Sequence, residues 1–367
     1  MGGLLALVRR ADKYLLIVSA LLISVGLLMI YSTTHADQGL ELFTRQIIFA
    51  AGGVLLLVFF AVLDYRYLRR LNGYIYAAGV ASLAGVLFFG FNIRGSQRWY
   101  DLGFFQLQPV EFMKLALIIF LASFFSRKIS QMHLKKNVAI SLLAAIVPVA
   151  LTLLQPDLGS AIVLGGIWFG MLLASKVNKK HIAFLLLGLL VVSVFAWFYI
   201  LEDYQKNRVL TFLDPAADPQ GTGYNAVQSI TAVGSGGFFG RGFARGVVSQ
   251  LRFLPERQTD FIFASLAEEL GLLGSSFLLV LLFLWFQRMV KIMHDSRENF
   301  GMLLALGIFV YLFVQTFVNI GMNIGIMPIT GIPLPLISYG GSSMVTSLIA
   351  IGILLSISIR TQPVRFD

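Results

Sequence analysis

The sequence predicts an all-α, polytopic membrane protein with ten transmembrane helices. Hydrophobic residues make up 57% of the 367 residues and charged residues only 13%, whereas a soluble domain carries about 25% charge. The mean hydropathy is +0.83. Runs such as 14–31 and 46–63 contain no charged residue and are long enough to cross the ~30 Å hydrocarbon core of a bilayer.

Apolar runs of this kind recur along the whole chain, which indicates a single integral membrane domain over residues 1–367. The first run is too long for the apolar core of a signal peptide and no cleavage motif clearly follows it, so we interpret it as a retained span. The longest loop, 202–261, joins the seventh and eighth spans, and we expect it to form short helices and turns. The predicted spans are 14–31, 44–63, 74–91, 109–125, 138–154, 159–174, 182–201, 262–286, 302–320 and 339–358.

Basic residues gather in the short loops on one side of these spans. The loops 32–43, 155–158 and 321–338 on the other side contain no Lys or Arg. The positive-inside rule therefore predicts that both termini are cytoplasmic and that the 202–261 loop is extracytoplasmic, since long loops cross the membrane largely regardless of charge. This placement explains the net charge of +10 without a nucleic-acid partner.

Two charged residues lie inside the fourth predicted span. Glu111 and Lys114 are three residues apart, so they share one helix face and can form an ion pair. Ionisable groups within a span usually face the bundle interior or a wet cavity. The alternative is that both lie in the first helical turn and extend outward to the membrane surface.

Asp157 follows Pro156 in the short connection between the fifth and sixth spans. Proline ends the preceding helix, so Asp157 is well placed to cap the sixth span. Because both flanking spans are shorter than the ~20 residues of an ordinary transmembrane helix, the connection is expected below the membrane surface. Asp157 is thus predicted either as a cap or as a carboxylate that lines an outward-facing cavity.

Two segments are rich in glycine or proline. The 319–343 segment should not be helical, and we expect a re-entrant loop that shapes a groove for an apolar ligand. The 221–246 segment invites comparison with a phosphate-binding loop, but it lacks the G-x-x-x-x-G-K-[ST] pattern and a preceding strand. We therefore expect no nucleotide and no organic cofactor. The absence of cysteine excludes disulfides and thiolate metal sites.

The stretch "LPERQTDFIF", 254–263, places charges directly before an apolar helix. One interpretation is that Thr259 or Asp260 is the N-cap of the eighth span. The other is a binding site, because arginines hold phosphate oxygens bidentately and a carboxylate can accept a proton from a hydroxyl nucleophile. The charged residues of this candidate site are Arg208, Arg252, Glu256, Arg257 and Asp260.

Several motifs in order along the chain resemble the SEDS family of RodA, FtsW and SpoVE. The resemblance covers nearly the whole chain and is closer to the elongation branch, RodA, than to FtsW. One departure is Val110, where the family usually has serine. The similar motifs are "GSQRWYDLG", "QPVEFMKL", "QPDLGSA", "RVLTFLDP", "GYNAVQSITAVGSGGFFGRG", "LPERQTDFIFASLAEELGLLG" and "NIGMNIGIMPITGIPLPLISYGGSS".

This resemblance implies a peptidoglycan glycosyltransferase that polymerises lipid II at the outer face of the cytoplasmic membrane, with Asp260 as its essential carboxylate. Transfer from an α-linked diphosphate to a β-linked polymer inverts the sugar carbon, so Asp260 is predicted as general base or, with Mg²⁺ or Mn²⁺, as metal ligand. The implied partners are a class B penicillin-binding protein and other elongation-complex membrane proteins. The predicted substrate-binding residues are Arg208, Arg252, Arg257, Glu256, Arg98, Trp99 and Lys114.

The alternative function is a lipid II flippase or transporter. Such a protein should hold the diphosphate near the middle of the bilayer, often between repeated halves with helices broken at matching positions. The sequence has no convincing repeat of this kind, and its densest charge lies in the predicted outer loop. These features favour the polymerase.

Overall fold

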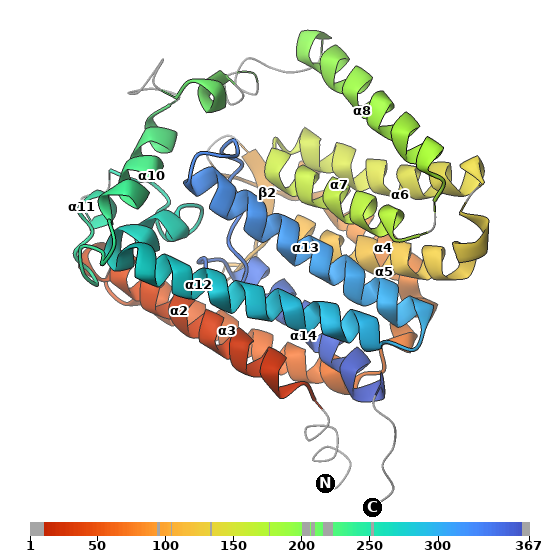
Figure 1. Cartoon of the computed structure of the whole chain (residues 1–367), viewed down its shortest axis with the longest axis horizontal. Helices are drawn as coiled ribbons and strands as arrows, with labels where there is room; N and C mark the ends of the chain where they lie inside the picture. Colours follow the sequence, from red (N-terminus) through yellow and green to blue (C-terminus); the bar gives the residue numbers. More distant parts are fainter. Residues whose placement is uncertain are drawn as a thin grey trace, which may run out of the picture.

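The computed structural model is mostly helical (Figure 1). It describes residues 11–93, 96–103, 105–132, 134–175, 177–199, 206, 210–215, 223–250 and 253–361.

A helix occupies each of the ten ranges in which the sequence predicts a span. Within the part of the chain that the structure describes, eight helices are long and apolar enough to cross a membrane, and α7 is apolar but shorter. The polytopic fold is confirmed. The number of ten membrane-crossing spans stays a prediction. The helices are α2 (Lys13–Gln38), α3 (Glu41–Val62), α4 (Arg66–Phe89), α5 (Pro109–Lys128), α6 (Lys135–Leu154), α7 (Leu158–Leu173), α8 (Lys179–Tyr199), α12 (Ile262–Asp295), α13 (Asn299–Asn323) and α14 (Gly341–Thr361).

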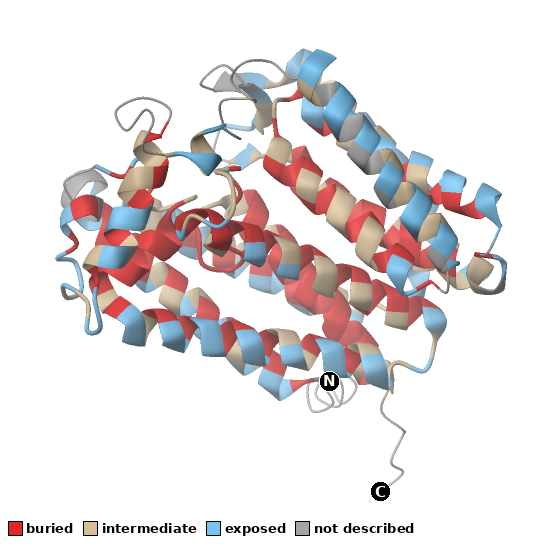
Figure 2. Cartoon of the chain, turned by 45° about the horizontal axis from the view of Figure 1, so that its top comes forward, coloured by how far each residue is buried: buried red, intermediate tan, exposed pale blue. Residues whose placement is uncertain are grey.

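The helices α14 and α5 form the centre of the bundle. Of the most apolar stretch of α14, 89% is buried within the protein, and the value for α5 is 78%, against 11% for α4. Figure 2 shows the same division, with buried residues on the inner helices and exposed residues on the outer faces. The exposed faces are rich in large apolar residues, as expected where lipid surrounds a bundle. Helix α8 lies at the edge of the bundle (Figure 1).

A small antiparallel sheet lies between α4 and α5, and we did not predict it from the sequence. It consists of β1 (Phe91–Ile93), β2 (Ser96–Asp101) and β3 (Gln106–Leu107) in the order β1-β2-β3. Tyr100 ties the sheet to α4, since its hydroxyl donates to the Ser82 carbonyl at 2.9 Å. Burial raises the pKa of Tyr100, and a tyrosine is a protonated donor at neutral pH even without this shift. A short 3₁₀ helix, Ile129–Gln131, follows α5.

Helix α12 is broken at Gly271, where φ is 65° and ψ is −160°. The break frees main-chain carbonyls of the preceding turn, and the glycine-rich segment after α10 (Tyr224–Ser235) fills the gap. The Arg241 amide donates to the Glu268 carbonyl at 3.0 Å. A Cβ built at Gly240 would lie only 2.2 Å from the Glu269 carbonyl oxygen. The glycines therefore allow main chain to pack on main chain. A second short helix, α11 (Val247–Gln250), follows.

The 324–340 segment connects α13 to α14 without regular secondary structure. The sequence correctly predicted a break in this region, but residues 319–323 still belong to α13. We expected the apolar side chains of this segment to line a groove. Three of them, Leu334, Leu336 and Ile337, are instead almost fully buried in the core. The central part of the segment is thus internal, whereas Ile324 and Ile326 at its start are exposed.

Candidate functional site

Asp260 lies just before the start of α12. Phe261 is the N-cap of this helix and its side chain makes no capping hydrogen bond. The amide of Ala264, in the first turn, donates to Oδ1 of Asn323 at 3.1 Å. The N-cap position is therefore Phe261, and not Thr259 or Asp260 as the sequence predicted. The chain enters the helix one residue later, and a side chain from α13 supplies the acceptor.

The main chain before Asp260 is bound to the 324–340 segment. The amide of Tyr339 donates to the Gln258 carbonyl at 2.9 Å. The hydroxyl of Ser338 donates to the Thr259 carbonyl at 2.6 Å. These are residues far apart in the sequence, and their contacts fix the loop of the "LPERQTDFIF" stretch against the C-terminal part of the bundle.

The carbonyl of Asp260 itself accepts two hydrogen bonds from α13. Nδ2 of Asn319 and Nδ2 of Asn323 each lie 3.0 Å from this oxygen. Asn319 also donates to the Ile332 carbonyl at 2.8 Å. Three consecutive carbonyls, those of residues 258 to 260, are therefore held from the same part of the protein.

The carboxylate of Asp260 lies beside the 324–340 segment. A Cβ built at Gly331, where φ is +72°, would lie 3.4 Å from Oδ2 of Asp260. The start of α7 reaches the neighbouring residue, because a Cβ built at Gly159 would lie 2.8 Å from the Thr330 carbonyl oxygen. The structure thus brings the Asp260 carboxylate and the first turn of α7 to adjacent positions of one segment.

Asp157 caps α7, which is one of the two roles that the sequence predicted for it. Its Oδ1 accepts from the Ser160 amide at 3.0 Å and its Oδ2 accepts from the Ser160 hydroxyl at 2.9 Å. Arg98 reaches this turn from β2: its Nε donates to the Gln155 carbonyl at 2.8 Å, and its terminal nitrogens contact the Pro156 carbonyl and the Asp157 carboxylate. Arg98 therefore links the small sheet to the turn between α6 and α7.

Glu111 and Lys114 form a buried ion pair, and both side chains are almost completely shielded. Nζ of Lys114 lies 2.6 Å from Oε1 of Glu111 and 2.9 Å from Oε1 of Gln315. The hydroxyl of Tyr311 donates to Oε2 of Glu111 at 3.2 Å. Gln315 in turn donates to the Pro333 carbonyl at 2.9 Å. The pair thus connects α5 to α13 and to the 324–340 segment.

Tyr311, Gln315, Asn319 and Asn323 form one polar row along α13. They recur at intervals of four residues, which places them on one face of the helix. All four are fully buried, and they contact the Glu111 pair at one end and the Asp260 carbonyl at the other. Sequence reasoning missed them, although polar residues at a fixed spacing of four in an apolar helix were a visible signal.

Two further carboxylates that the sequence analysis did not single out are buried in α12. Oε1 of Glu268 accepts from the Val248 amide at 2.7 Å. Glu269 accepts from the Ser32 hydroxyl at 2.7 Å and from the Ala244 amide at 3.1 Å. Both side chains are fully buried. Together they attach the 244–248 part of the loop and helix α2 to α12, just beyond Asp260.

The other predicted site residues are placed as follows. Arg257 is buried, with 6% of its surface exposed. Glu256 is partly exposed and has a φ of 53°, an unfavourable backbone conformation for a residue other than glycine. Trp99 belongs to β2 and is partly exposed. Arg208 and Arg252 lie outside the described residues.

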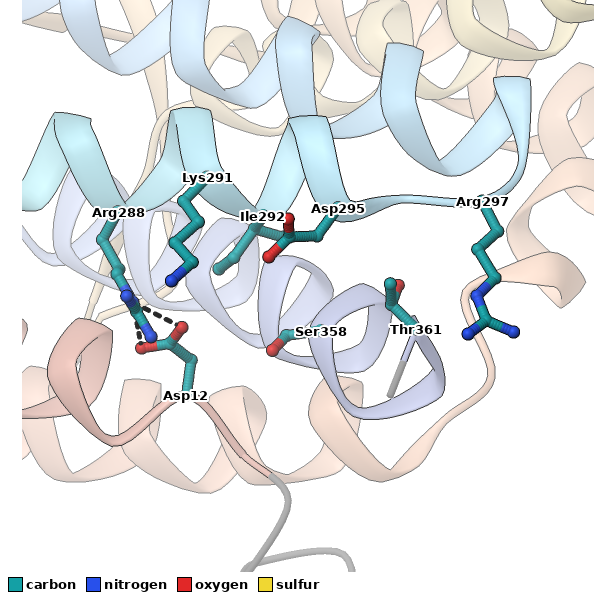
Figure 3. Close-up of a pocket in the computed structure, with 8 residues that line it drawn as sticks. All are labelled: Asp12, Arg288, Lys291, Ile292, Asp295, Arg297, Ser358 and Thr361. Carbon is teal, nitrogen blue, oxygen red and sulfur yellow. Dashed lines mark hydrogen bonds and ion pairs between the residues drawn. The ribbon is translucent and has the colours of Figure 1, made fainter. Parts of the chain in front are cut away.

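A cavity of about 400 Å³ lies at the opposite end of α12 from Asp260 (Figure 3). Its wall contains Asp12 and Arg288, whose Nε is 2.6 Å from Oδ2 of Asp12. Lys291, Asp295 and Arg297 also line it. Asp12 precedes α2, and Ser358 and Thr361 at the end of α14 also line the cavity. The first and the last described helices therefore meet there. Its acidic and basic groups are mixed, and it is separate from the Asp260 region.

Comparisons with known proteins show matches over nearly the whole chain. The sequence model of the FtsW, RodA and SpoVE family, described as a cell cycle protein, matches residues 12–362. The chain is 41% identical over 351 residues to the peptidoglycan glycosyltransferase MrdB of Escherichia coli K12, covering 94% of this chain and 93% of that protein.

Two solved structures have the same fold. A chain from a structure on polymerization and crosslinking by a peptidoglycan synthase complex matches with a TM-score of 0.83 and 31% identity, covering 97% of this chain and 99% of that chain. The rod shape determining protein RodA of Thermus thermophilus matches with a TM-score of 0.71 and 28% identity, covering 95% and 96%. The predicted resemblance is confirmed: this chain is a multi-pass membrane protein of the SEDS family.

Proposed function

We propose that this protein is a peptidoglycan glycosyltransferase that polymerises lipid II into glycan strands, and that Asp260 is its general base or metal ligand. The names of its relatives support the activity. The observation that carries the residue assignment is the position of Asp260. Its carboxylate lies beside Gly331, in a stretch whose three successive carbonyls are all held from distant parts of the chain. General-base catalysis requires such a fixed carboxylate.

The proposed reaction is a single displacement. The 4-hydroxyl oxygen of the acceptor sugar forms a bond to the anomeric carbon of the donor, and the bond from that carbon to the diphosphate oxygen breaks. Asp260 accepts the hydroxyl proton, and the polyprenyl diphosphate leaves as an anion. Attack from the opposite side inverts the anomeric carbon from α to β. Neutralisation of the leaving group is assigned to the arginines predicted to bind substrate, Arg208, Arg252 and Arg257.

The described residues contain no group of three or more His, Asp or Glu side chains arranged to hold a metal ion. Mg²⁺ is often held by one or two carboxylates together with substrate phosphates. Asp260 therefore fits a cation as one ligand of a set that the diphosphate and water complete. A cation held in this way would stabilise the negative charge of the leaving diphosphate.

The proposed setting is the bacterial cytoplasmic membrane, with both termini cytoplasmic and the 202–261 loop outside. A class B penicillin-binding protein would crosslink the strands that this protein makes. The similarity to a chain of a peptidoglycan synthase complex supports such a partner. A lateral opening for the lipid tail is part of the same proposal, because the polyprenyl chain stays in the bilayer while its sugar is joined outside.

The test uses the purified full-length chain in lipid nanodiscs with its transpeptidase partner and fluorescent lipid II. The parent should produce long glycan strands. Asp260→Asn keeps the shape and removes the charge, so the rate should fall roughly 10²–10⁴-fold with an unchanged melting temperature. A folded Asp260→Asn protein that polymerises at the parent rate would refute the assignment. Translocation of lipid II in proteoliposomes without any polymer would instead establish a flippase.

A further inference from the structure

We infer that Asn319 and Asn323 are positioning residues that hold the Asp260 carboxylate in its reactive orientation. The inference rests on the proposed function of Asp260 and extends it to two side chains that never touch the reacting atoms in this scheme. Both asparagines come from α13, a different helix from the one that Asp260 precedes. The contact is therefore a tertiary one that sequence neighbours cannot provide.

The side-chain amides of Asn319 and Asn323 use all of their N–H donors close to the Asp260 carbonyl. An asparagine amide has two N–H donors. Those of Asn319 go to the carbonyls of Asp260 and Ile332, and those of Asn323 go to the carbonyls of Asp260 and Asn319, all at 2.8–3.0 Å. Neither asparagine has any exposed surface, so bulk water does not compete for these hydrogen bonds. Two converging donors on one oxygen fix both the position and the tilt of that peptide group.

The direction of the Asp260 side chain depends on this peptide group. The carbonyl belongs to the same residue as the carboxylate. If the peptide group tilts, the Cα atom moves with it, and the direction of the bond from Cα to Cβ changes. The preceding carbonyls of residues 258 and 259 are held by Tyr339 and Ser338. The two asparagines extend this restraint to Asp260 itself. A displacement of ~1 Å at a reacting group can lower a rate about 100-fold.

Asn323 has a second role that must be separated from the first. Its Oδ1 accepts from the Ala264 amide in the first turn of α12, so it also caps that helix. Asn323→Asp keeps an oxygen for this cap and removes the Nδ2 donor to Asp260. Asn323→Ala removes both. Asn319 makes no such cap, so Asn319→Ala tests the donor to Asp260 without disturbing the cap, although it also removes the hydrogen bond to the Ile332 carbonyl. It remains informative if Asn323→Asp fails to fold.

The experiment measures kcat and KM for lipid II in the nanodisc complex. Positioning predicts that Asn319→Ala, Asn323→Asp and Asn323→Ala each lower kcat roughly 10–100-fold with KM nearly unchanged. Asn299→Asp, the same residue type at the other end of α13 and exposed, should have no effect. If Asn323→Asp and Asn319→Ala keep the parent kcat and only Asn323→Ala loses it, Asn323 is merely a cap and the inference is wrong.

A second measurement does not depend on the chemistry. The chain has no cysteine, so a single cysteine introduced as Gln258→Cys can be labelled with maleimide without background. Loss of the asparagine donors should loosen this stretch and raise the labelling rate several-fold, whereas Asn299→Asp should leave it unchanged. Unchanged labelling in all three variants would refute the inference. Faster labelling together with full activity of Asp260→Asn would instead refute only the proposed role of Asp260.

Discussion

Nζ of Lys114 lies 2.6 Å from Oε1 of Glu111 in the middle of the helix bundle, and 0% and 1% of the two side chains are exposed. The sequence left two possibilities, a pair or two side chains extending to the membrane surface. Burial decides for the pair, since neither group reaches the surface. Removing one partner would leave a charge without its counterion in a low-dielectric interior.

We predict strong energetic coupling between Glu111 and Lys114. Glu111→Gln and Lys114→Met should each destabilise the protein by about 3–5 kcal/mol, and the double variant should lose less than the sum. A thermal double-mutant cycle in detergent measures this coupling. The exposed pair of Arg45 and Glu41, 2.7 Å apart, is the control and should show only about 0.3–0.5 kcal/mol. A coupling for the buried pair as small as that of the control would contradict the prediction.

Gly159 is predicted to be intolerant of even one methyl group. A Cβ there would lie 2.8 Å from the Thr330 carbonyl oxygen and 2.5 Å from a methyl group of Ile332. Gly159→Ala should therefore destabilise the protein by about 1–3 kcal/mol through overpacking and reduce activity by moving the segment beside Asp260. Gly165→Ala, in the same helix with no atom within 4 Å, should be neutral or slightly stabilising. Equal melting temperatures for the two variants would be the contrary outcome.

Asp157→Asn is predicted to lower stability and activity together. Asparagine keeps the acceptor for the Ser160 amide, but an NH₂ group in place of Oδ2 cannot accept from the Ser160 hydroxyl, and the charge opposite Arg98 is lost. We expect a loss of about 1–3 kcal/mol and a partial loss of polymerisation, unlike the selective effect of Asp260→Asn. Melting temperature and strand synthesis on the same preparation check this. A fully stable but inactive Asp157→Asn protein would point to a chemical role.

Gly236 should be essential for attaching the loop that contains α10 and α11 near the break in α12. A Cβ there would lie 2.0 Å from the Ala267 carbonyl oxygen, and main chain cannot move aside as a flexible side chain can. Gly236→Ala should loosen the loop, which limited proteolysis of the folded protein would detect as faster cleavage. Gly234→Ala, two residues earlier with no atom within 4 Å, is the control. Identical cleavage rates for the two variants would show that the close approach is unimportant.

Local properties of the chain predicted much of the helical framework. Apolar runs give helices because a span must satisfy its own backbone hydrogen bonds, and a helix lies at each expected range. The boundaries were less accurate. The eighth helix continues to Asp295, well past the predicted 286, because a helix need not end where lipid ends. Residues 319–323 stay helical, and their asparagines bind Asp260 and Ile332, contacts that no local pattern reveals.

The sequence by itself determined the membrane class, the approximate position of each helix, the family and the candidate carboxylate Asp260. For Asp157 it offered a cap as one of two roles, and the structure shows that cap; a cap involves only near neighbours in the sequence. Only the tertiary structure decided that Glu111 pairs with Lys114 in the interior and that Asn319 and Asn323 meet at Asp260. Asn319 and Asn323 lie 59 and 63 positions from Asp260, and the Glu111–Lys114 pair is held by Gln315 and Tyr311, which are 201 and 200 positions away. These contacts depend on how the helices pack. Spacing along one helix shows which side chains share a face, but the partner of that face is fixed by the fold alone.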